Sequence, residues 1–263
     1  MIPKIIHYCW LSGDEFPSLI KKCMDSWKEK LPDYEFILWD TKRFDLESNI
    51  WVKQAFETKK YAFAADYIRL FAIYHYGGIY LDTDVEVLKS FNDLLDRPYI
   101  VGSEGLGIIE AGVFGAKKNS SWVKQCLDYY SNKTFINTAD GSFNTSTLPR
   151  IIMSQLSNFK TVEEVLPAEL SVAQQQKNDK ILYMFPKDFF CAKNHGTGVI
   201  EKTTNTYCIH HFAMSWVPKK QLFLPSLKKK IMKVFGVKTV NKIIRITGLY
   251  RLREKYYYKK YKR

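Results

Sequence analysis

Cysteine pairs are absent from this 263-residue sequence, whose five cysteines are scattered, odd in number and never spaced as C-x-x-C. That pattern argues against a zinc site and a disulfide framework, and it is typical of a reducing compartment. Long apolar runs are missing as well, because no stretch reaches the roughly 18 residues that a membrane-spanning helix needs. The short apolar run at the N-terminus is soon followed by acids, unlike a signal peptide. We therefore expect a cytoplasmic chain without a signal peptide or a membrane anchor.

A dinucleotide-binding fingerprint and internal repeats are also absent. The glycine-rich run GSEGLG at residues 102–107 does not have the spacing G-x-G-x-x-G, and no clear helix follows it. We expect a mobile loop there. Apolar residues make up 46% of the chain and aromatic residues 15%, so the composition excludes a disordered protein and allows a sizeable core.

Excess positive charge is confined to a C-terminal tail. The net charge is +13, yet residues 217–263 hold 16 Lys or Arg and a single acid, which leaves residues 1–216 close to neutral. Such a tail can bind nucleic acid or anionic lipid. Its apolar residues recur at helical spacing between lysines, as in amphipathic helices that bind membrane surfaces. These apolar residues are Leu227, Ile231, Val234 and Phe235. We expect a membrane surface rather than nucleic acid, with packing of this stripe on the rest of the chain as the alternative.

The first forty residues predict a β-α-β unit. Residues 2–10 are apolar and β-prone, residues 17–31 carry an apolar side opposite a lysine-rich side, and residues 34–39 are again β-prone. This alternation indicates an α/β protein. His7 lies within the first apolar strand, where a core histidine is more common than a ligand.

The stretch from Tyr61 to Val85 is the centre of the sequence argument. Residues 61–76 have helical length and are apolar on nearly every face, which predicts a buried helix. Asp66 and Arg69 are the fully charged residues within it, and their three-residue spacing places them on one face. The Gly77-Gly78 pair that follows can end the helix in a left-handed turn.

A short strand predicted at residues 79–81 leads from the two glycines into Asp82-Thr83-Asp84. In an extended segment the two carboxylates point the same way. At the C-terminal end of a strand they suit a hard divalent cation that takes further ligands from a diphosphate. Taken alone, Asp-x-Asp is usually a solvated turn, and Asp66 with Arg69 is usually a helix-face ion pair. Four charges around one turn of an apolar segment are costly to bury without a partner, which favours a metal and diphosphate site.

The pattern Asp66-x-x-Arg69 followed by Gly77-Gly78-x-Tyr80-x-Asp82-x-Asp84 resembles the signature of the DXD-motif sugar-transferring glycosyltransferases of family 32 type. That family includes capsular polysaccharide glycosyltransferases, initiating α-mannosyltransferases and the catalytic domains of clostridial glucosylating toxins. The resemblance implies a GT-A fold, which is a Rossmann-like mixed sheet flanked by helices. We therefore expect a single catalytic domain at residues 1–216 and a basic helical tail at residues 217–263.

The resemblance also implies roles for these residues. Asp66 and Arg69 would hold the sugar of a nucleotide-diphosphate donor, and Tyr80 would pack near it. Asp82 and Asp84 would serve a Mn²⁺ or Mg²⁺ ion, and transfer would retain the anomeric configuration. The opening IPKIIHYCW resembles the family's first strand, which implies that three residues lie against the nucleotide base. These residues are Tyr8, Cys9 and Trp10; from the sequence alone, a core position is equally plausible for Trp10.

A second informative stretch, YCIHHFAMSW, covers residues 207–216 and resembles the C-terminal motif of the family. In the family, one residue of this segment completes the metal shell, which implies that role for His210 or His211. A serine–tryptophan pair of the family touches the diphosphate, which implies that role for Ser215 and Trp216. Imidazole is an acceptable manganese ligand beside carboxylates. The two histidines point to opposite faces if the segment is extended, so at most one serves, and the sequence does not choose between them.

Two positions depart from the family's pattern. Glu110 stands in the predicted strand IIEAGVFGA, at residues 108–116, where family members usually present a small or amide residue. The following Ala111-Gly112 could let a substrate approach the backbone. The TGP-type motif that begins a helix in the family is not clearly kept in FNTSTLPR, so Asn144 is a weak site candidate and a helix-capping role is more common for such a residue.

The sequence thus predicts a metal-dependent, retaining glycosyltransferase with a UDP-sugar favoured as donor. The expected acceptor is a glycan, lipid-linked, in bacterial surface polysaccharide synthesis, and the expected location is the inner face of the plasma membrane. Two alternatives stay open: a nucleotidyl or phosphoryl transferase on the same metal site, and a non-enzymatic protein that binds membrane or nucleic acid.

Overall fold

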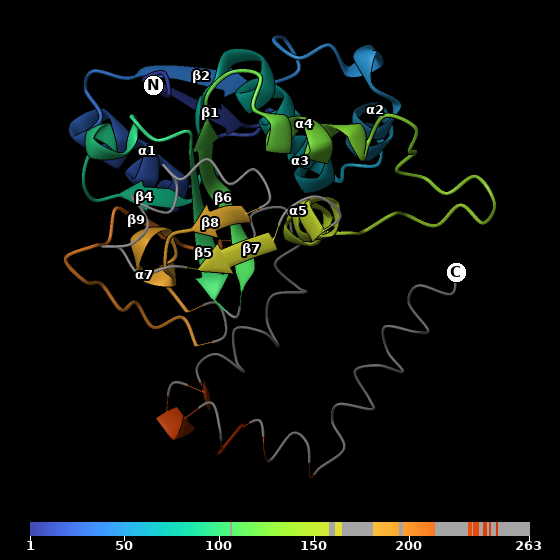
Figure 1. Cartoon of the computed structure of the whole chain (residues 1–263). Helices are drawn as coiled ribbons and strands as arrows, with labels where there is room; N and C mark the ends of the chain where they lie inside the picture. The colour runs from blue at the N-terminus through green and yellow to red at the C-terminus, as the bar shows by residue number, and fades with distance from the viewer. Residues whose placement is uncertain are drawn as a thin grey trace. The chain divides into compact units, whose positions relative to one another are not determined.

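Figure 1 shows the computed structural model of the chain. The structure describes residues 1–105, 107–157, 161–164, 181–194 and 197–213, and in the tail residues 231, 232, 234–236, 239, 240, 242 and 246. The chain divides into two compact units. The first, Met1–Ala192 with Lys202–Ala213, contains every element discussed below, and the second comprises Lys193–Glu201 and Met214–Arg263.

A five-stranded mixed sheet forms the centre of the first unit. The strand order is β2 (Glu35–Trp39), β1 (Ile5–Cys9), β3 (Gly78–Leu81), β6 (Ile108–Ala116) and β5 (Tyr99–Gly105). The first three strands run parallel, whereas β6 is antiparallel to both β3 and β5. The chain therefore has the mixed α/β sheet that the sequence predicts.

The predicted β-α-β unit is confirmed, because helix α1 (Ser18–Lys30) connects the parallel neighbours β1 and β2. Two smaller sheets accompany the central one. Strand β4 (Val85–Val87) pairs antiparallel with β9 (Cys208–His210), so residues far apart in the sequence become neighbours. Strand β7 (Thr161–Glu164) pairs parallel with β8 (Ile181–Met184).

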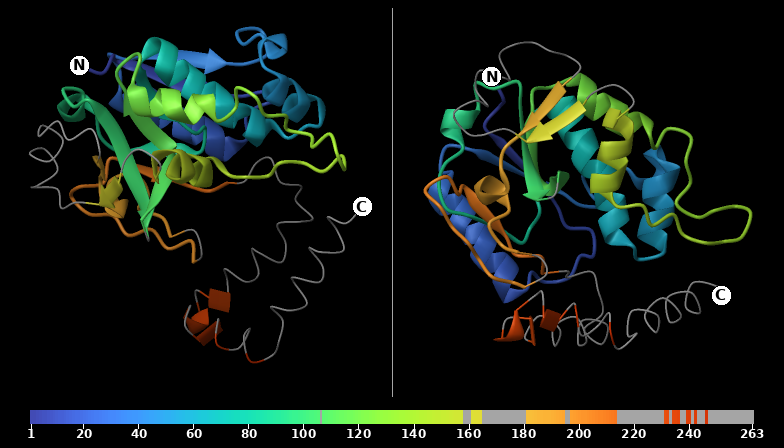
Figure 2. Two further views of the ribbon diagram at one scale, coloured as in Figure 1. Left: turned by 45° about the vertical axis from the view of Figure 1, so that its right-hand side comes forward. Right: turned by 60° about the horizontal axis from the view of Figure 1, so that its bottom comes forward.

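Helices cover both faces of the central sheet (Figure 2). On one face lie α2 (Ile50–Glu57), α3 (Tyr61–Tyr76), α4 (Ser121–Asp128) and α5 (Leu148–Ser157), which share one hydrophobic core with the sheet. On the other face α1 and the β4–β9 pair share a second core with it. The remaining elements are the short helix α7 (Lys187–Phe190) and the 3₁₀ turns η1 (Leu46–Ser48) and η2 (Asn92–Leu94). Among the described residues, no helix is both long and apolar enough to cross a membrane.

Strand β3 contributes to both cores, because Tyr80 faces the helices α2–α5 while Ile79 and Leu81 face the side of α1. A strand buried on both faces reads as an unbroken apolar run, as it does here. Gly78 is required at its start, since it has a φ of +106° and an added Cβ would lie 2.6 Å from the carbonyl oxygen of Ile5. The Gly77–Gly78 pair thus ends α3 and allows β3 to pack tightly against β1.

The expected loop at residues 102–107 is corrected by the structure, which extends β5 through Glu104 to Gly105. The strand is held by the ladder with β6, where Ser103 pairs with Ile109 and Gly105 with Ile108. Long-range pairing therefore outweighs the local preference of glycine for loops. The sequence also predicts a short connector at residues 87–95, and the structure places the last residue of β4 and the turn η2 there.

Candidate active site

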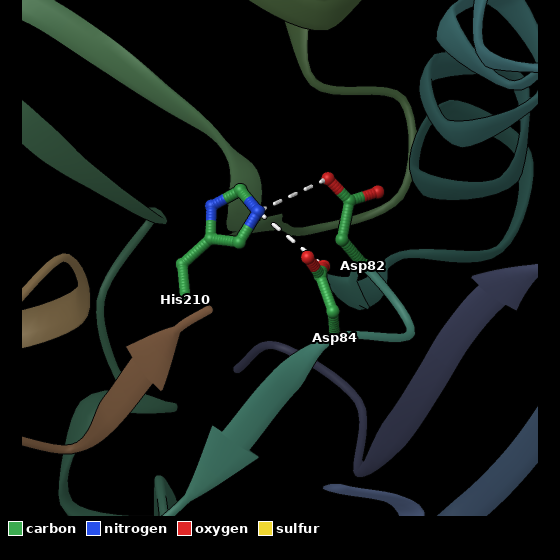
Figure 3. A group of neighbouring side chains, drawn as sticks. All are labelled: Asp82, Asp84 and His210. Carbon is green, nitrogen blue, oxygen red and sulfur yellow. Dashed lines mark ion pairs between the residues drawn. The ribbon is translucent and has the colours of Figure 1, made fainter. Parts of the chain in front are cut away.

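Asp82 and Asp84 lie where the parallel strands β1 and β3 end, as expected for a ligand site in an open α/β sheet. The sequence argument assumed an extended segment, and that detail is wrong. Asp82–Asp84 form a turn between β3 and β4, in which the Val85 N–H donates to the Asp82 carbonyl at 3.0 Å. The two carboxylates nevertheless converge on one imidazole (Figure 3).

That imidazole belongs to His210, the last residue of β9. Its Nε2 lies 3.4 Å from Asp84 Oδ1 and 3.9 Å from Asp82 Oδ2. The pairing of β9 with β4 places His210 opposite Val85, directly after the two acids. Among the described residues, these three side chains form a group in which one ligand atom from each lies within 4.8 Å of the others.

His211 belongs to a different cluster. Its Nε2 lies 2.8 Å from Glu86 Oε2, and Glu86 also pairs with Lys22 at 3.0 Å. Because neighbouring residues of a strand point to opposite faces, one histidine reaches the acids and the other does not. The structure therefore answers the question that the sequence left open, in favour of His210 as the candidate ligand.

Arg69 links the helix α3 to the same acids. Its Nη2 lies 3.3 Å from Asp66 Oδ1 and 3.2 Å from Asp82 Oδ1, and its Nη1 donates to the Ala111 carbonyl at 2.8 Å. The guanidinium also stands 4.6 Å from the centre of the Tyr80 ring. The Tyr80 hydroxyl donates to Asp82 Oδ1 at 3.0 Å. Motif residues that lie up to 16 positions apart in the sequence thus form one connected group, with Arg69 at its centre.

Glu110 is the residue whose importance the sequence argument missed, noting it only as a departure from a family pattern. It is 2% exposed, and its Oε1 accepts a hydrogen bond from the Gly112 N–H at 2.7 Å. The same oxygen lies 3.0 Å from His210 Nδ1. An ionised carboxylate only accepts hydrogen bonds, so His210 donates here through Nδ1.

Gly112 has no side chain, and the side chains of His210, Asp82 and Glu110 lie close to it. A Cβ at this position would lie 2.8 Å from His210 Cε1 and 2.9 Å from both Asp82 Oδ2 and Glu110 Oε1. Contacts this short are not tolerated by rigid neighbours, so any side chain here would displace the acids or the imidazole. The approach of a substrate to the backbone at Ala111-Gly112 stays a prediction, and the neighbours of Gly112 in this structure are the protein's own side chains.

Burial and charge act in opposite directions on these groups. Burial raises the pKa of Asp66 to about 7, even though Arg69 acts to lower it. At Asp84, burial is outweighed by the charge and hydrogen bonding of His210 and by the Ala213 N–H, so its pKa lies below the ordinary value. Burial also acts to lower the pKa of His210, but Glu110 and Asp84 raise it well above 6.5. The site thus strongly favours positive charge between its carboxylates.

The donor set fits a divalent cation. Two carboxylates and one imidazole nitrogen are ligands that Mn²⁺ accepts, and oxygen ligands alone would suit Mg²⁺. The surroundings add to the fit, because the missing side chain at Gly112 keeps the space clear. Asp82, Asp84 and His210 would hold the ion, whose uptake replaces the proton on Nε2.

The predicted base-binding residues lie at the end of β1. Tyr8 is partly exposed and packs edge-on against Trp27, while Cys9 is buried and its pKa is raised to about 12 by that burial. Trp10 is partly exposed and packs against Phe16 with ring centres 4.9 Å apart. Their contact with a base stays a prediction.

Other predicted candidates lie elsewhere or outside the described residues. Asn144 belongs to a surface pocket in the segment between α4 and α5, and its Oδ1 accepts a hydrogen bond from the Ser146 N–H. Ser215 and Trp216 lie outside the described residues, as does most of the tail at residues 217–263. His7 is buried as expected, with Nδ1 accepting from Trp39 Nε1 and Nε2 donating to the Gly77 carbonyl.

Several known proteins that are similar to this chain are named glycosyltransferases. Inositol phosphoceramide mannosyltransferase 3 of Schizosaccharomyces pombe is 33% identical over 133 residues, which are 48% of this chain and 36% of that protein. The chain thus covers about a third of the yeast relatives that it matches. An uncharacterized glycosyltransferase of Acanthamoeba polyphaga mimivirus is 25% identical over 233 residues, 84% of this chain and 86% of that protein. The solved PaToxG glycosyltransferase has a TM-score of 0.48 at 20% identity, over 66% of this chain and 73% of that one.

The family match itself falls on the segment that contains α3 and the two acids. Residues 17–101 match the glycosyltransferase sugar-binding region containing DXD motif. Asp66, Arg69, Asp82 and Asp84 all lie within it. Over this region the chain is similar to the DXD-motif sugar-transferring glycosyltransferases, the similarity that the spacing of its motif predicted.

Proposed function

We propose that this chain is a metal-dependent glycosyltransferase that moves a sugar from a nucleotide-diphosphate donor to a glycan or glycolipid acceptor. The observation that carries the proposal is the convergence of Asp82, Asp84 and His210 within 4.8 Å. A Mn²⁺ or Mg²⁺ ion bound there would neutralise the charge that develops on the leaving diphosphate. Such a site needs no further protein cation at the diphosphate.

Donor-sugar binding is proposed for Asp66 and Arg69. Arg69 is held by Asp66, Asp82 and the Ala111 carbonyl, so its position is set before a donor arrives. A preorganised polar group contributes more than one that must be ordered on binding. Asp66 is the remaining acceptor on this side, suited to sugar hydroxyl donors. Retention of configuration is carried over from the family resemblance and needs no second catalytic carboxylate if the leaving phosphate oxygen takes the acceptor proton.

For the acceptor and the donor we propose only broad chemical classes. The S. pombe relative is named a mannosyltransferase of inositol phosphoceramide, which is a lipid, and this favours a lipid-linked acceptor. The sequence resemblance alone supports a UDP-sugar and a role in bacterial surface polysaccharide synthesis. Mannose donors and UDP-hexoses are therefore both to be tested.

The C-terminal tail is proposed to bind an anionic membrane surface, at the cytoplasmic face of the plasma membrane. Residues 217–263 carry 16 Lys or Arg and one acid, and Val234 and Phe235 are exposed in the described part of the tail. Each basic residue near an anionic leaflet contributes about 1 kcal/mol. Removing residues 217–263 should abolish binding to phosphatidylserine vesicles and leave hydrolysis of a soluble donor intact. Loss of salt-sensitive RNA or DNA binding instead would contradict the membrane assignment.

The test of the enzymatic proposal is a screen of UDP- and GDP-sugars for slow hydrolysis with Mn²⁺. Wild-type protein should release a nucleoside diphosphate, and the Asp82→Ala variant should not. Release of pyrophosphate would indicate nucleotidyl transfer. A wild-type protein that neither binds Mn²⁺ nor turns over any donor would overturn the proposal.

A further inference from the structure

Glu110 is buried beside the candidate metal site but does not belong to the group of Asp82, Asp84 and His210 whose ligand atoms lie within 4.8 Å of one another. Strand β6 brings it there, because the pairing of β6 with β3 sets Val113 beside Leu81, one residue before the DXD turn. The carboxylate is fixed by its own strand, since its Oε1 accepts the Gly112 N–H at 2.7 Å. It therefore presents an oxygen of fixed position to His210 Nδ1, 3.0 Å away.

The two nitrogens of His210 have different surroundings. Nδ1 faces Glu110, while Nε2 faces Asp84 at 3.4 Å and Asp82 at 3.9 Å. A neutral imidazole carries its single proton on one nitrogen and its lone pair on the other. A proton held on Nδ1 by Glu110 leaves the lone pair on Nε2, the nitrogen that faces the two acids.

Other contacts restrict the plane of the His210 ring but do not determine which of its nitrogens is protonated. The Phe212 ring stacks on His210 with centres 4.1 Å apart and planes 28° apart. At Gly112 the absence of a side chain allows Cε1 to approach the backbone. These contacts are apolar or steric, so the choice of tautomer depends on the carboxylates, with Glu110 at Nδ1 and the two aspartates at Nε2; a cation on the aspartates leaves Glu110 as the acceptor for the ring proton.

We propose that Glu110 is a positioning residue that orients His210 and holds its proton on Nδ1, and thereby sets the affinity of the Asp82–Asp84–His210 site for its divalent cation. The inference rests on the proposed metal site. Carboxylates that hold the outer nitrogen of a metal-binding histidine typically change metal affinity 10- to 100-fold when they are removed. Nothing in the family's DXD signature assigns this role to the position.

The neighbouring histidine supplies a matched control. His211 and Glu86 form a second histidine–carboxylate pair, 2.8 Å apart, in which Glu86 lies on β4 and His211 directly follows β9. This pair points away from Asp82 and Asp84. Glu86→Gln therefore alters the carboxylate partner of a histidine one residue away without changing the candidate metal site.

The experiment measures Mn²⁺ binding to the full chain by isothermal titration calorimetry. Glu110→Ala should weaken Mn²⁺ binding about 10- to 100-fold. Glu110→Gln keeps the side-chain shape and an oxygen acceptor but lacks charge, and should weaken binding less. Glu86→Gln should bind as the wild type does. Thermal unfolding without added metal checks that each variant is folded. If Glu110→Ala is not folded, the Mn²⁺ affinity of Glu110→Gln tests the inference.

A second readout reports the tautomer directly. Long-range ¹H–¹⁵N spectra of the metal-free protein, at a pH where His210 is neutral, should show its proton on Nδ1 in the wild type, and Glu110→Ala should lose this preference. Unchanged Mn²⁺ affinity and an unchanged tautomer in a folded Glu110 variant would overturn the inference alone. A wild-type chain that binds no Mn²⁺ would overturn the proposed metal site as well, so the two failures are distinguishable.

Discussion

The Ala213 backbone N–H donates a 2.6 Å hydrogen bond to Asp84 Oδ2, joining residues 129 positions apart. The His211 N–H also donates to the Asp84 carbonyl oxygen at 3.0 Å. Asp84 therefore faces His210 with one carboxylate oxygen while the other fixes the chain just beyond it. This bond links the DXD turn to the C-terminal segment of the unit. The Asp84 side chain therefore contributes to the candidate metal site and also fixes the backbone next to it.

Replacing Asp84 separates these two functions. Asp84→Ala removes the charge and the bond to Ala213, and we expect donor hydrolysis to fall by about 100-fold or more. Asp84→Asn can still accept from Ala213 and should keep the melting temperature close to wild type while losing most Mn²⁺ affinity. Hydrolysis, Mn²⁺ titration and thermal unfolding are measured on both variants. Full activity of Asp84→Asn would show that its charge is not needed.

Two glycine substitutions should affect different properties, namely Mn²⁺ binding for Gly112→Ala and stability for Gly78→Ala. Gly112→Ala places a Cβ 2.8 Å from His210 Cε1, and we expect it to weaken Mn²⁺ binding strongly while the protein stays folded. Gly78→Ala is strained at a φ of +106° and meets the Ile5 carbonyl oxygen at 2.6 Å. It should lower the free energy of unfolding by about 2 kcal/mol or more. Mn²⁺ titration and urea unfolding of both variants test the contrast, which fails if Gly112→Ala binds Mn²⁺ normally.

His7 should make the protein less stable in acid. Burial lowers its pKa from 6.5 to about 4, and protonation would break the bond that Nδ1 accepts from Trp39. Between these pH values the unfolded chain binds a proton that the folded chain does not, so stability falls as the pH falls from 6.5 to 4. The loss amounts to about 3 kcal/mol.

The His7→Gln variant isolates this effect, because glutamine can accept from Trp39 and donate to Gly77 without titrating. Urea unfolding of both proteins is followed from pH 7.5 to pH 4. The advantage of the wild type over the variant should shrink by about 3 kcal/mol over this range. Parallel curves would show that His7 is not the group responsible.

Arg69 should be important for stability as well as for binding. Arg69→Met leaves Asp66 and Asp82 without their shared cation, and breaking a buried pair in this way costs about 3 kcal/mol or more. Adding Asp66→Asn should recover part of the loss, because it removes a buried acid that has lost its cationic partner. Urea unfolding of the single and double variants measures both effects.

An exposed ion pair provides the control. Lys53 and Glu47 lie 2.7 Å apart, but their side chains are 36% and 70% exposed. Lys53→Met should change the free energy of unfolding by less than about 1 kcal/mol. Equal losses for Arg69→Met and Lys53→Met would contradict the special role of burial at Arg69.

The local sequence predicted the elements whose signals lie in a single segment. The helix α3 begins and ends at the predicted residues, and β6 spans the predicted range. The Gly77–Gly78 turn and the buried state of His7 were also predicted. These features follow from apolar patterning, glycine and strand-forming residues, which act over a few neighbouring positions.

The sequence by itself determined the sugar-binding motif, through the spacing of Asp66, Arg69, Asp82 and Asp84, and it placed Asp82 and Asp84 at a strand end. Only the tertiary structure decided that His210 rather than His211 joins them, and that Glu110 stands behind it. Those choices depend on the register between β4 and β9 and between β3 and β6. A shift of one residue in either ladder would turn a different side chain toward the acids, and pairing between distant strands leaves no local pattern from which that register can be read.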